Sequence, residues 1–290
     1  IGFQNDTIHV DSKKQELEIV LRDGVELKEV NVVSRKLGTM KLRNSVMNED
    51  MISSAELSRA ACCNLGESFV TNPSVDVSYS DAATGAKQIK LLGLSGTYVQ
   101  MLTENIPNYR GAAAPYGLGY VPGPWMQSIQ VSKGISSVKN GYEAITGQIN
   151  VEFKKPQLPE ADWVSANLFA STTNRYEANA DATLKLSKRW STSLLAHYEN
   201  ETKAHDGNDD GFVDIPQVEQ YNVWNRWAYM GDHYVFQAGI KALSETRTSG
   251  QANHGGTMHS GDLYKVGIDT ERYEFFTKNA YIFNKEKNTN

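Results

Sequence analysis

The sequence has only two cysteines among its 290 residues, Cys62 and Cys63, and they are adjacent. Neighbouring cysteines rarely form a disulfide because the bond geometry is strained, so a secreted fold held together by disulfides is excluded. The pair is interpreted either as two small, partly buried residues on a helix or as a soft-metal or redox site. The chain also lacks an apolar run of about 18 residues, which excludes a transmembrane helix.

An excess of basic residues is absent too. The net charge is −5 and the isoelectric point is about 5.7, which argues against nucleic-acid binding. The sequence contains no G-x-S-x-G, H-E-x-x-H or Cys-x-x-Cys motif, and its six histidines have no nucleophile at a recognisable spacing. We therefore expect that the protein is not an enzyme.

The ends of the chain lack the usual features of a complete protein. The sequence begins Ile1-Gly2-Phe3, without an initiator methionine or a signal peptide, and ends on a polar tail at residues 284–290. Both ends are expected to be cuts through a larger protein. Hydrophobic residues make up 40% and charged residues 22%, so neither a disordered nor a fibrous chain is expected.

Three zones follow one another along the chain. Residues 7–10 and 16–21 predict an edge hairpin that is too small to be stable alone, so residues 1–24 are expected to be the end of a small β domain. Residues 25–159 predict a glycine-rich α+β domain with a short helix after Ser53. Its predicted strands are residues 87–92, 98–103, 129–133 and 147–153.

The third zone, residues 160–290, has longer strands that alternate strictly. Residues 177–186 carry polar side chains on one face and alanine or leucine on the other. Further segments alternate in the same way: residues 164–171, 190–198 and 234–242. About ten such residues match a tilted strand that crosses a membrane, whereas a soluble β-sandwich would favour larger core residues than alanine. About six strands fit before residue 283, too few to close a barrel around the preceding domain.

The connections in this zone differ in length between its two ends. Residues 187–189 and 231–233 predict tight turns, whereas residues 200–219 and 246–269 predict long polar loops. Short turns on one side and long loops on the other are typical of outer-membrane barrels. Aromatic residues stand where the membrane interfaces would fall. They are Trp190 and Tyr234 near the short turns, and Tyr198 and Tyr221 near a long loop.

Two stretches of the α+β zone resemble the plug of a TonB-dependent outer-membrane receptor. Residues 87–107 are similar to the central plug strands, although the family ending Asp-Gly-Val-Pro is replaced by Glu-Asn-Ile-Pro at residues 104–107. Residues 126–151 follow the last plug motif, I-x-V-x-x-G-x-x-S-x-x-x-G-x-x-A-x-x-G-x-I-N. The glycines of this motif are interpreted as structural. The zone order resembles the Bacteroidetes type, which carries a carboxypeptidase-regulatory-like extension.

The resemblance implies a fold and domain boundaries. Residues 1–24 would end the carboxypeptidase-regulatory-like β domain, residues 25–159 would form the plug domain, and residues 160–290 would be the first strands of the outer-membrane β-barrel. The expected fold is therefore an α+β plug domain followed by antiparallel transmembrane β-barrel strands that form an incomplete barrel.

The resemblance also implies a function and partners. The fragment would belong to a receptor in the cell outer membrane that imports a scarce ligand when TonB pulls on the plug. Siderophore, haem, cobalamin, glycan and copper all remain open as ligands. The partners would be TonB, the small-molecule or metal-complex ligand, outer-membrane lipid and a surface lipoprotein, with no nucleic acid. The alternatives are a surface carbohydrate-binding β protein without transport activity and an enzyme on a β-rich scaffold.

Two sets of residues carry these expected interactions. The TonB-coupling segment would be an extended stretch whose β-branched residues suit strand addition, or else a plain linker strand. Its residues are Glu26, Leu27, Glu29, Val30, Val32 and Val33. Apical plug loops near residues 80–86 and 105–124 would contact the ligand, or else their aromatic residues pack against the barrel wall. The candidates are Asn108, Tyr109, Arg110, Tyr116, Tyr120 and Trp125.

Two loops carry candidate metal ligands, and no cofactor is required by the expected function. Residues 206–214 follow the first half of a calcium loop, but Gln217 stands where the bidentate glutamate belongs, so the loop predicts a weak Ca²⁺ site or an acidic turn. The ligands would be Asp206, Asn208, Asp210, Phe212 and Asp214. His254, Met258 and His259 suggest copper or zinc, or else a polar loop.

Overall fold

The computed structural model describes residues 39–41, 48–60, 63–70, 72–94, 96–135, 143–157, 163–252 and 263–283. The chain divides into two units, residues 1–36 and 37–290. The first unit lies outside the described residues, and with it the predicted β domain and the TonB-coupling segment. No helix in the described part of the chain is long and apolar enough to cross a membrane.

Residues 39–157 form an α+β domain around a mixed six-stranded sheet in the order β1-β2-β7-β8-β5-β6, in which only β5 and β8 pair in parallel. The strands of this sheet are β1 (Thr39–Lys41), β2 (Asn48–Ser53), β5 (Val99–Thr103), β6 (Ile106–Pro107), β7 (Met126–Lys133) and β8 (Gly147–Phe153). A separate hairpin consists of β3 (Val75–Asp81) and β4 (Ala86–Leu91). The helices are α1 (Ser54–Arg59) and the short 3₁₀ turns η1 (Glu67–Phe69), η2 (Gly96–Tyr98), η3 (Gly111–Ala113) and η4 (Gly123–Trp125).

The strands β4, β5, β7 and β8 and the helix α1 match those expected from the sequence, with small shifts at their ends, whereas β1, β2, β3 and β6 were not predicted. The backbone N–H of Glu56 donates to Ser53 Oγ, so Ser53 caps α1 at its N-terminus. The strand predicted at residues 98–103 begins at Val99 because Gly96–Tyr98 forms a 3₁₀ turn. Ile129 is fully buried between Ile52 on β2 and Val151 on β8, and this cross-strand row forms the centre of the core.

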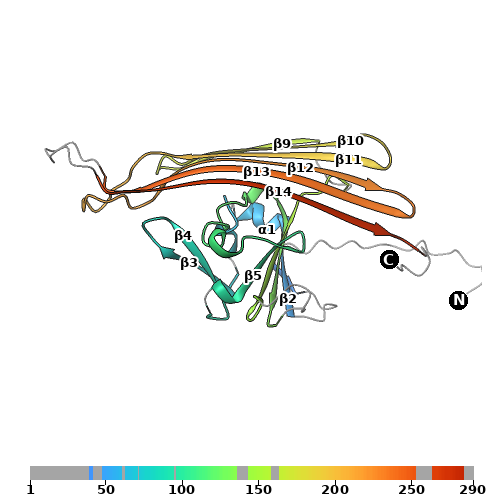
Figure 1. The fold of residues 1–290 in the computed structure, drawn as a ribbon, viewed down its shortest axis with the longest axis horizontal. Coiled ribbons are helices and arrows are strands. Elements are labelled where there is room, and N and C mark those ends of the chain that lie inside the picture. The colour runs from blue at the N-terminus through green and yellow to red at the C-terminus, as the bar shows by residue number, and fades with distance from the viewer. Residues whose placement is uncertain are drawn as a thin grey trace, which may run out of the picture. The chain divides into compact units, whose positions relative to one another are not determined.

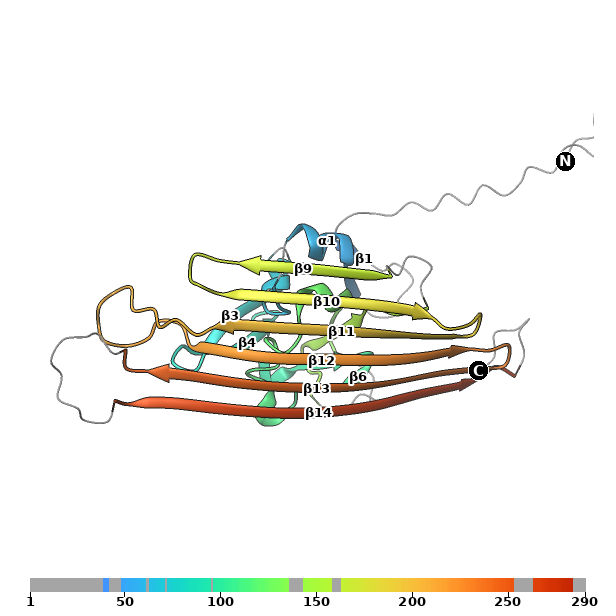
Figure 2. The same ribbon diagram turned by 90° about the horizontal axis from the view of Figure 1, so that it is seen from above.

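Residues 163–283 form a second sheet, the wall sheet, whose six antiparallel strands pair in chain order (Figure 2). The strands are β9 (Val164–Ala170), β10 (Tyr176–Lys185), β11 (Trp190–Glu201), β12 (Gln217–Met230), β13 (Tyr234–Gly250) and β14 (Lys265–Tyr281). The number of strands agrees with the expectation. The sheet is open at β9 and β14 within the described residues, so these strands are part of a barrel wall and not a closed barrel.

The wall sheet buries its polar face and exposes its apolar face. Glu177, Asn179 and Asp181 are buried on β10, whereas Leu184 is 46% exposed, and Leu194 on β11 is also 46% exposed. A soluble sandwich would show the opposite arrangement, with its apolar face buried. The burial pattern therefore confirms the barrel interpretation of the alternating strands.

The two ends of the wall sheet differ, as expected (Figure 2). Tight turns join β10 to β11 and β12 to β13 at one end, and the opposite end carries the longer connection at residues 202–216. The predicted loop limits were wrong, because β13 continues to Gly250 and β14 begins at Lys265. The strands run on through polar residues such as Thr246 and Thr248, where apolar alternation gives no signal.

The α+β domain packs against the buried face of the wall sheet (Figure 1). Phe153 of β8 meets Trp224 of β12 edge-on at 5.2 Å between ring centroids, and Trp224 stacks on Phe276 of β14 at 5.4 Å. Leu195 and Leu243 of the wall belong to the same apolar cluster as the core of the α+β domain. Apart from these residues, the buried side chains of the wall are largely polar.

Candidate functional site

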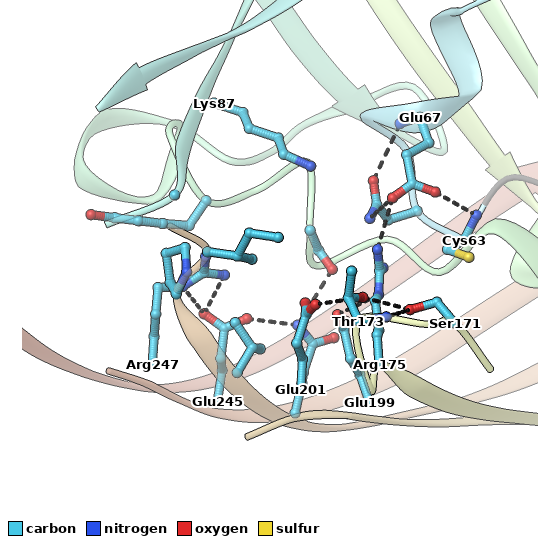
Figure 3. Close-up of a pocket in the computed structure, with 18 of the residues that line it drawn as sticks. Cys63, Glu67, Lys87, Ser171, Thr173, Arg175, Glu199, Glu201, Glu245 and Arg247 are labelled. Carbon is cyan, nitrogen blue, oxygen red and sulfur yellow. Dashed lines mark hydrogen bonds and ion pairs between the residues drawn. The ribbon is translucent and has the colours of Figure 1, made fainter. Parts of the chain in front are cut away.

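A cavity of about 390 Å³ lies between the α+β domain and the wall sheet, close to the wall's long-loop end (Figure 3). The wall contributes residues near the end of β11, the start of β12 and the end of β13, together with the end of β9 and the turn that joins it to β10. The α+β domain contributes β3, β4 and the loops around Cys63 and Tyr116. The charged residues lining the cavity are Glu67, Lys87, Arg175, Glu199, Glu201, Glu245 and Arg247.

A row of polar residues crosses the wall at this level. Strand register aligns Glu177 with Glu199, Glu199 with Gln220, and Gln220 with Glu245. Carboxylates directly opposite each other on neighbouring strands repel, so such a row needs compensating cations. Alternation along each strand determines that these side chains face inward, and strand pairing determines that they meet.

Arg175 supplies the compensation at one end of this row. Its guanidinium lies 2.6 Å from Glu177, 3.0 Å from Glu199 and 3.0 Å from Glu67, measured between nitrogen and carboxylate oxygen. Glu67 belongs to the α+β domain, so Arg175 ties that domain to the wall. Three carboxylates thus share a single cation, which leaves Arg175 without charge to spare for a ligand.

Arg247 has a similar role at the other end. Its Nη2 lies 3.1 Å from Glu245 Oε1, its Nη1 donates to the Thr84 carbonyl at 3.3 Å, and the guanidinium lies 5.4 Å from the Tyr116 ring. Gly85, at the tip of the β3–β4 hairpin, has φ +68°, and a Cβ there would lie 2.9 Å from Arg247 Nη1. Glycine therefore suits the backbone of the hairpin tip, and a larger residue there would displace the end of the Arg247 side chain and press on Pro216.

Two charged groups of the cavity have no ion-pair partner among the described residues. The Nζ of Lys87 faces the Tyr79 ring at 5.5 Å, and burial lowers the pKa of this amine. Glu201 accepts one long hydrogen bond, 3.3 Å from Thr173 Oγ1. Figure 3 shows Lys87 entering the cavity from the α+β domain and Glu201 from the wall.

Cys63 lines the same cavity and is buried. Its backbone N–H donates to Glu67 Oε2 at 3.0 Å. Burial, together with the nearby carboxylates of Glu177 and Glu67, raises the pKa of the Cys63 thiol well above its usual range. A thiol held protonated in this way is a poor nucleophile and a poor metal ligand. Cys62 lies outside the described residues.

The predicted ligand-binding residues occupy several different environments. Tyr116 lines the cavity. Tyr109, Tyr120 and Trp125 are buried, and Lys241 of β13 donates at 2.9 Å to both the Tyr109 hydroxyl and the Tyr120 carbonyl. Lys241 Nζ also lies 6.0 Å from the centre of the Trp125 ring, and these contacts favour the alternative that the three aromatic residues pack against the wall. Ligand contact by any of them stays a prediction.

The two remaining candidates are also engaged within the protein. Asn108 Nδ2 donates to Glu274 Oε2 at 2.9 Å, and its Oδ1 accepts from Arg272, at 2.5 Å. Arg110 Nε lies 2.7 Å from Glu143 Oε2. Asn108 therefore links the loop to β14, whereas Arg110 links it to the segment that precedes β8.

The predicted calcium loop forms an acidic turn whose backbone also pairs with the end of β13, through Val213 N–H to the Gly250 carbonyl and Ala252 N–H to the Gly211 carbonyl. Asp206 accepts from the backbone N–H groups of Asp210 and Gly211, Asp210 accepts from Phe212 N–H, and Asp214 accepts from Gly207 N–H. No group of three or more His, Cys, Asp or Glu side chains that could hold a metal ion occurs in the described residues. Occupation by Ca²⁺ stays a prediction. His254, Met258 and His259 lie outside the described residues.

Sequence reasoning did not find most of the cavity's charged residues. Glu199, Glu201, Glu245 and Arg247 each lie on the inward face of an alternating strand, where polar residues occur throughout and none stands out. The signal that brings them together is cross-strand register, which requires the pairing of β10 to β13. Lys87 lies within a predicted strand and carries no motif.

The fold and the cavity define a class of architecture: a mixed α+β domain seated against the polar face of an open antiparallel sheet whose other face is apolar. Residues 41–148 match the family model of the TonB-dependent Receptor Plug Domain. The α+β domain is therefore a plug domain, and the resemblance to TonB-dependent receptors seen in the sequence is confirmed. The Bacteroidetes type and the carboxypeptidase-regulatory-like extension stay predictions.

Solved structures share this fold. The Pseudomonas aeruginosa receptor FpvA bound to a pyoverdine–iron complex matches with a TM-score of 0.65 and 13% identity, over 85% of this chain and 33% of its own. The siderophore receptor PirA from Acinetobacter baumannii matches with a TM-score of 0.57 and 18% identity, over 81% and 38% respectively. The chain thus spans about a third of the length of these receptors. No curated protein matches the sequence.

Proposed function

We propose that the chain forms the plug and first wall strands of a TonB-dependent outer-membrane receptor that imports a scarce ligand by energy-coupled rearrangement of the plug. The observation that carries this proposal is the inverted wall sheet, polar toward the plug and apolar toward the outside. Such a sheet suits lipid on one side and an occupied lumen on the other. The solved structures with this fold are receptors and not enzymes, which supports the absence of catalysis.

The ligand would bind in the cavity between plug and wall. The cavity lies at the long-loop end, which in outer-membrane barrels is the extracellular end. The solved receptors that share this fold include one bound to a pyoverdine–iron complex and one in complex with enterobactin. A siderophore is therefore the first ligand class to test here, with haem, cobalamin, glycan and copper as alternatives. TonB would pull on the segment at residues 26–33, and a surface lipoprotein would assist capture.

Growth of a deletion strain under limitation for one nutrient at a time tests this proposal. The strain would carry the full-length receptor, or its Val32→Pro or Val32→Ala variant. Proline cannot donate a backbone hydrogen bond to an added strand, so Val32→Pro should abolish uptake while leaving outer-membrane localisation and ligand binding intact. Val32→Ala controls for loss of the side chain. A receptor found in the soluble fraction would contradict the proposal and favour the surface-binding alternative. Uptake that is independent of TonB would contradict the energy coupling.

A further inference from the structure

Most of the charged groups that line the cavity have an ion-pair partner, but two of them have none in the part of the chain that the structure describes. Arg175 is held by Glu67, Glu177 and Glu199, and Arg247 by Glu245 and the Thr84 carbonyl. These contacts use every cavity cation except Lys87 and every lining carboxylate except Glu201. Lys87 and Glu201 are therefore the two lining charges that have no ion-pair partner among the described residues.

These two groups come from opposite sides of the cavity. Lys87 projects from β4 of the plug domain and Glu201 from the end of β11 of the wall (Figure 3). Within the described part of the chain, no acidic side chain lies within ion-pair distance of Lys87, and no basic one lies within that distance of Glu201. Lys87 is half-buried and Glu201 is buried, and a charge in such a place without a partner is costly, so each group would gain from a ligand of opposite charge.

The rest of the lining suits the uncharged body of such a ligand. Tyr79, Tyr116 and Phe169 contribute aromatic surface, and the Oε1 of Gln220 is a buried acceptor without a hydrogen bond. The volume of about 390 Å³ falls at the small end of the range for small-molecule sites. The lining therefore combines aromatic walls with a donor on one side and acceptors on the other.

We infer that this cavity selects a zwitterionic compound, whose anionic group binds Lys87 on the plug and whose protonated amine binds Glu201 on the wall. The inference rests on the proposed import function and narrows its ligand class. A ligand of this kind would bridge the plug domain and the wall sheet, so its binding would neutralise one charge on each of them.

Calorimetric titration of the purified full-length receptor with four forms of one dipeptide tests this inference. The probe is phenylalanyl-glycine with both ends free, with the amine acetylated, with the carboxylate amidated, and with both ends blocked. If each charge contact contributes about tenfold in affinity, either single block should weaken binding about tenfold and the double block about 100-fold.

Two variants assign the contacts. Lys87→Met should remove the preference for a free carboxylate and keep the preference for a free amine, and Glu201→Gln should do the reverse. Lys90→Met on the same strand and Glu219→Gln on β12 are matched controls that should bind all four probes as the unmodified receptor does, because neither residue lines the cavity.

Three results would overturn the inference: no binding of the free-ended probe, equal affinity of the receptor for all four probes, or an affinity that falls by the same factor for all four probes in both variants. These results differ from failure of the proposed function. Import measured by TonB-dependent growth would remain intact if only the ligand class is wrong, and would be absent if the receptor assignment is wrong.

Discussion

The ion pair between Glu104 and Arg226 gives a quantitative test of how the plug is seated. Glu104 directly follows β5 of the plug, Arg226 lies on β12 of the wall, and their side chains are 1% and 0% exposed. Arg226 Nη2 lies 2.5 Å from Glu104 Oε1, while the Nζ atoms of Lys155 and Lys278 lie 3.7 and 3.6 Å from Glu104 Oε2. One carboxylate thus neutralises a fully buried guanidinium.

Glu104→Gln removes the negative charge but keeps an oxygen that can accept from the Phe153 backbone N–H. Arg226 then remains as a buried charge without its partner, and breaking a buried pair in this way costs about 3–5 kcal/mol. Replacing both partners is far less damaging than replacing one. The double variant Glu104→Gln with Arg226→Met should therefore be more stable than Glu104→Gln alone.

Hydrogen exchange of the β5 and β8 amides in the full-length receptor measures this cost as the free energy of plug opening. A loss of about 3 kcal/mol corresponds to exchange faster by about 100-fold. Arg226→Met in the Glu104→Gln background should restore most of the protection. Two results would refute the reasoning. One is unchanged exchange in Glu104→Gln. The other is a double variant whose loss of opening free energy equals the sum of the losses in the two single variants.

Three further predictions use matched pairs or a simple chemical probe. Leu194→Arg, on the outward face of β11, should destabilise the folded receptor in lipid by about 2–4 kcal/mol, whereas Leu186→Arg beside a short turn should cost about 1 kcal/mol or less. Equal urea unfolding midpoints for the two variants would contradict exposure of Leu194 to lipid. Gly85→Ala and Gly93→Ala both strain a positive φ, +68° and +82°, but only Gly85 would press on the wall, so only Gly85→Ala should weaken ligand affinity measured by titration. Cys63, whose thiol pKa is raised by burial, should have little thiolate at pH 8 and resist iodoacetamide until the protein is unfolded, as followed by mass spectrometry; rapid labelling of the folded receptor would show that the thiol is accessible.

The architecture was predictable from the sequence because its main signals are local. Strict alternation at residues 177–186 marks a strand with one apolar face, and the inverted burial of Glu177 and Leu184 agrees with that pattern. Ser53 caps α1 as its position before the helix predicted. The strand ends were less predictable, since β13 continues beyond Thr246 into residues that are polar on both faces.

The site was less predictable because its members meet only through strand pairing and domain seating. Tyr109 and Tyr120 stand in a loop rich in aromatic residues, and nothing local shows that their partner is Lys241, more than 120 residues away. The departure from the family pattern at residues 104–107 is another case. Glu104 and Asn105 both have positive φ, 55° and 60°, where the family pattern has Asp-Gly. The sequence shows the substitution but not that the glutamate neutralises Arg226.

The chemistry of the plug–wall contact bears directly on how such a plug could move. A barrel strand has lipid on its outer side, so its inner side is free to be polar, and here the buried wall residues include Glu199, Arg226 and Lys241. An interface built on apolar burial would lose free energy in proportion to the area exposed when it opened. An interface built on ion pairs and hydrogen bonds can exchange these contacts for contacts with water. Hydration then gives the separated charges back much of the interaction free energy that they lose. A ligand that bridged Lys87 and Glu201 would therefore act on the polar part of this interface, where ion pairs and hydrogen bonds can be exchanged for contacts with water, and this would suit the proposed import.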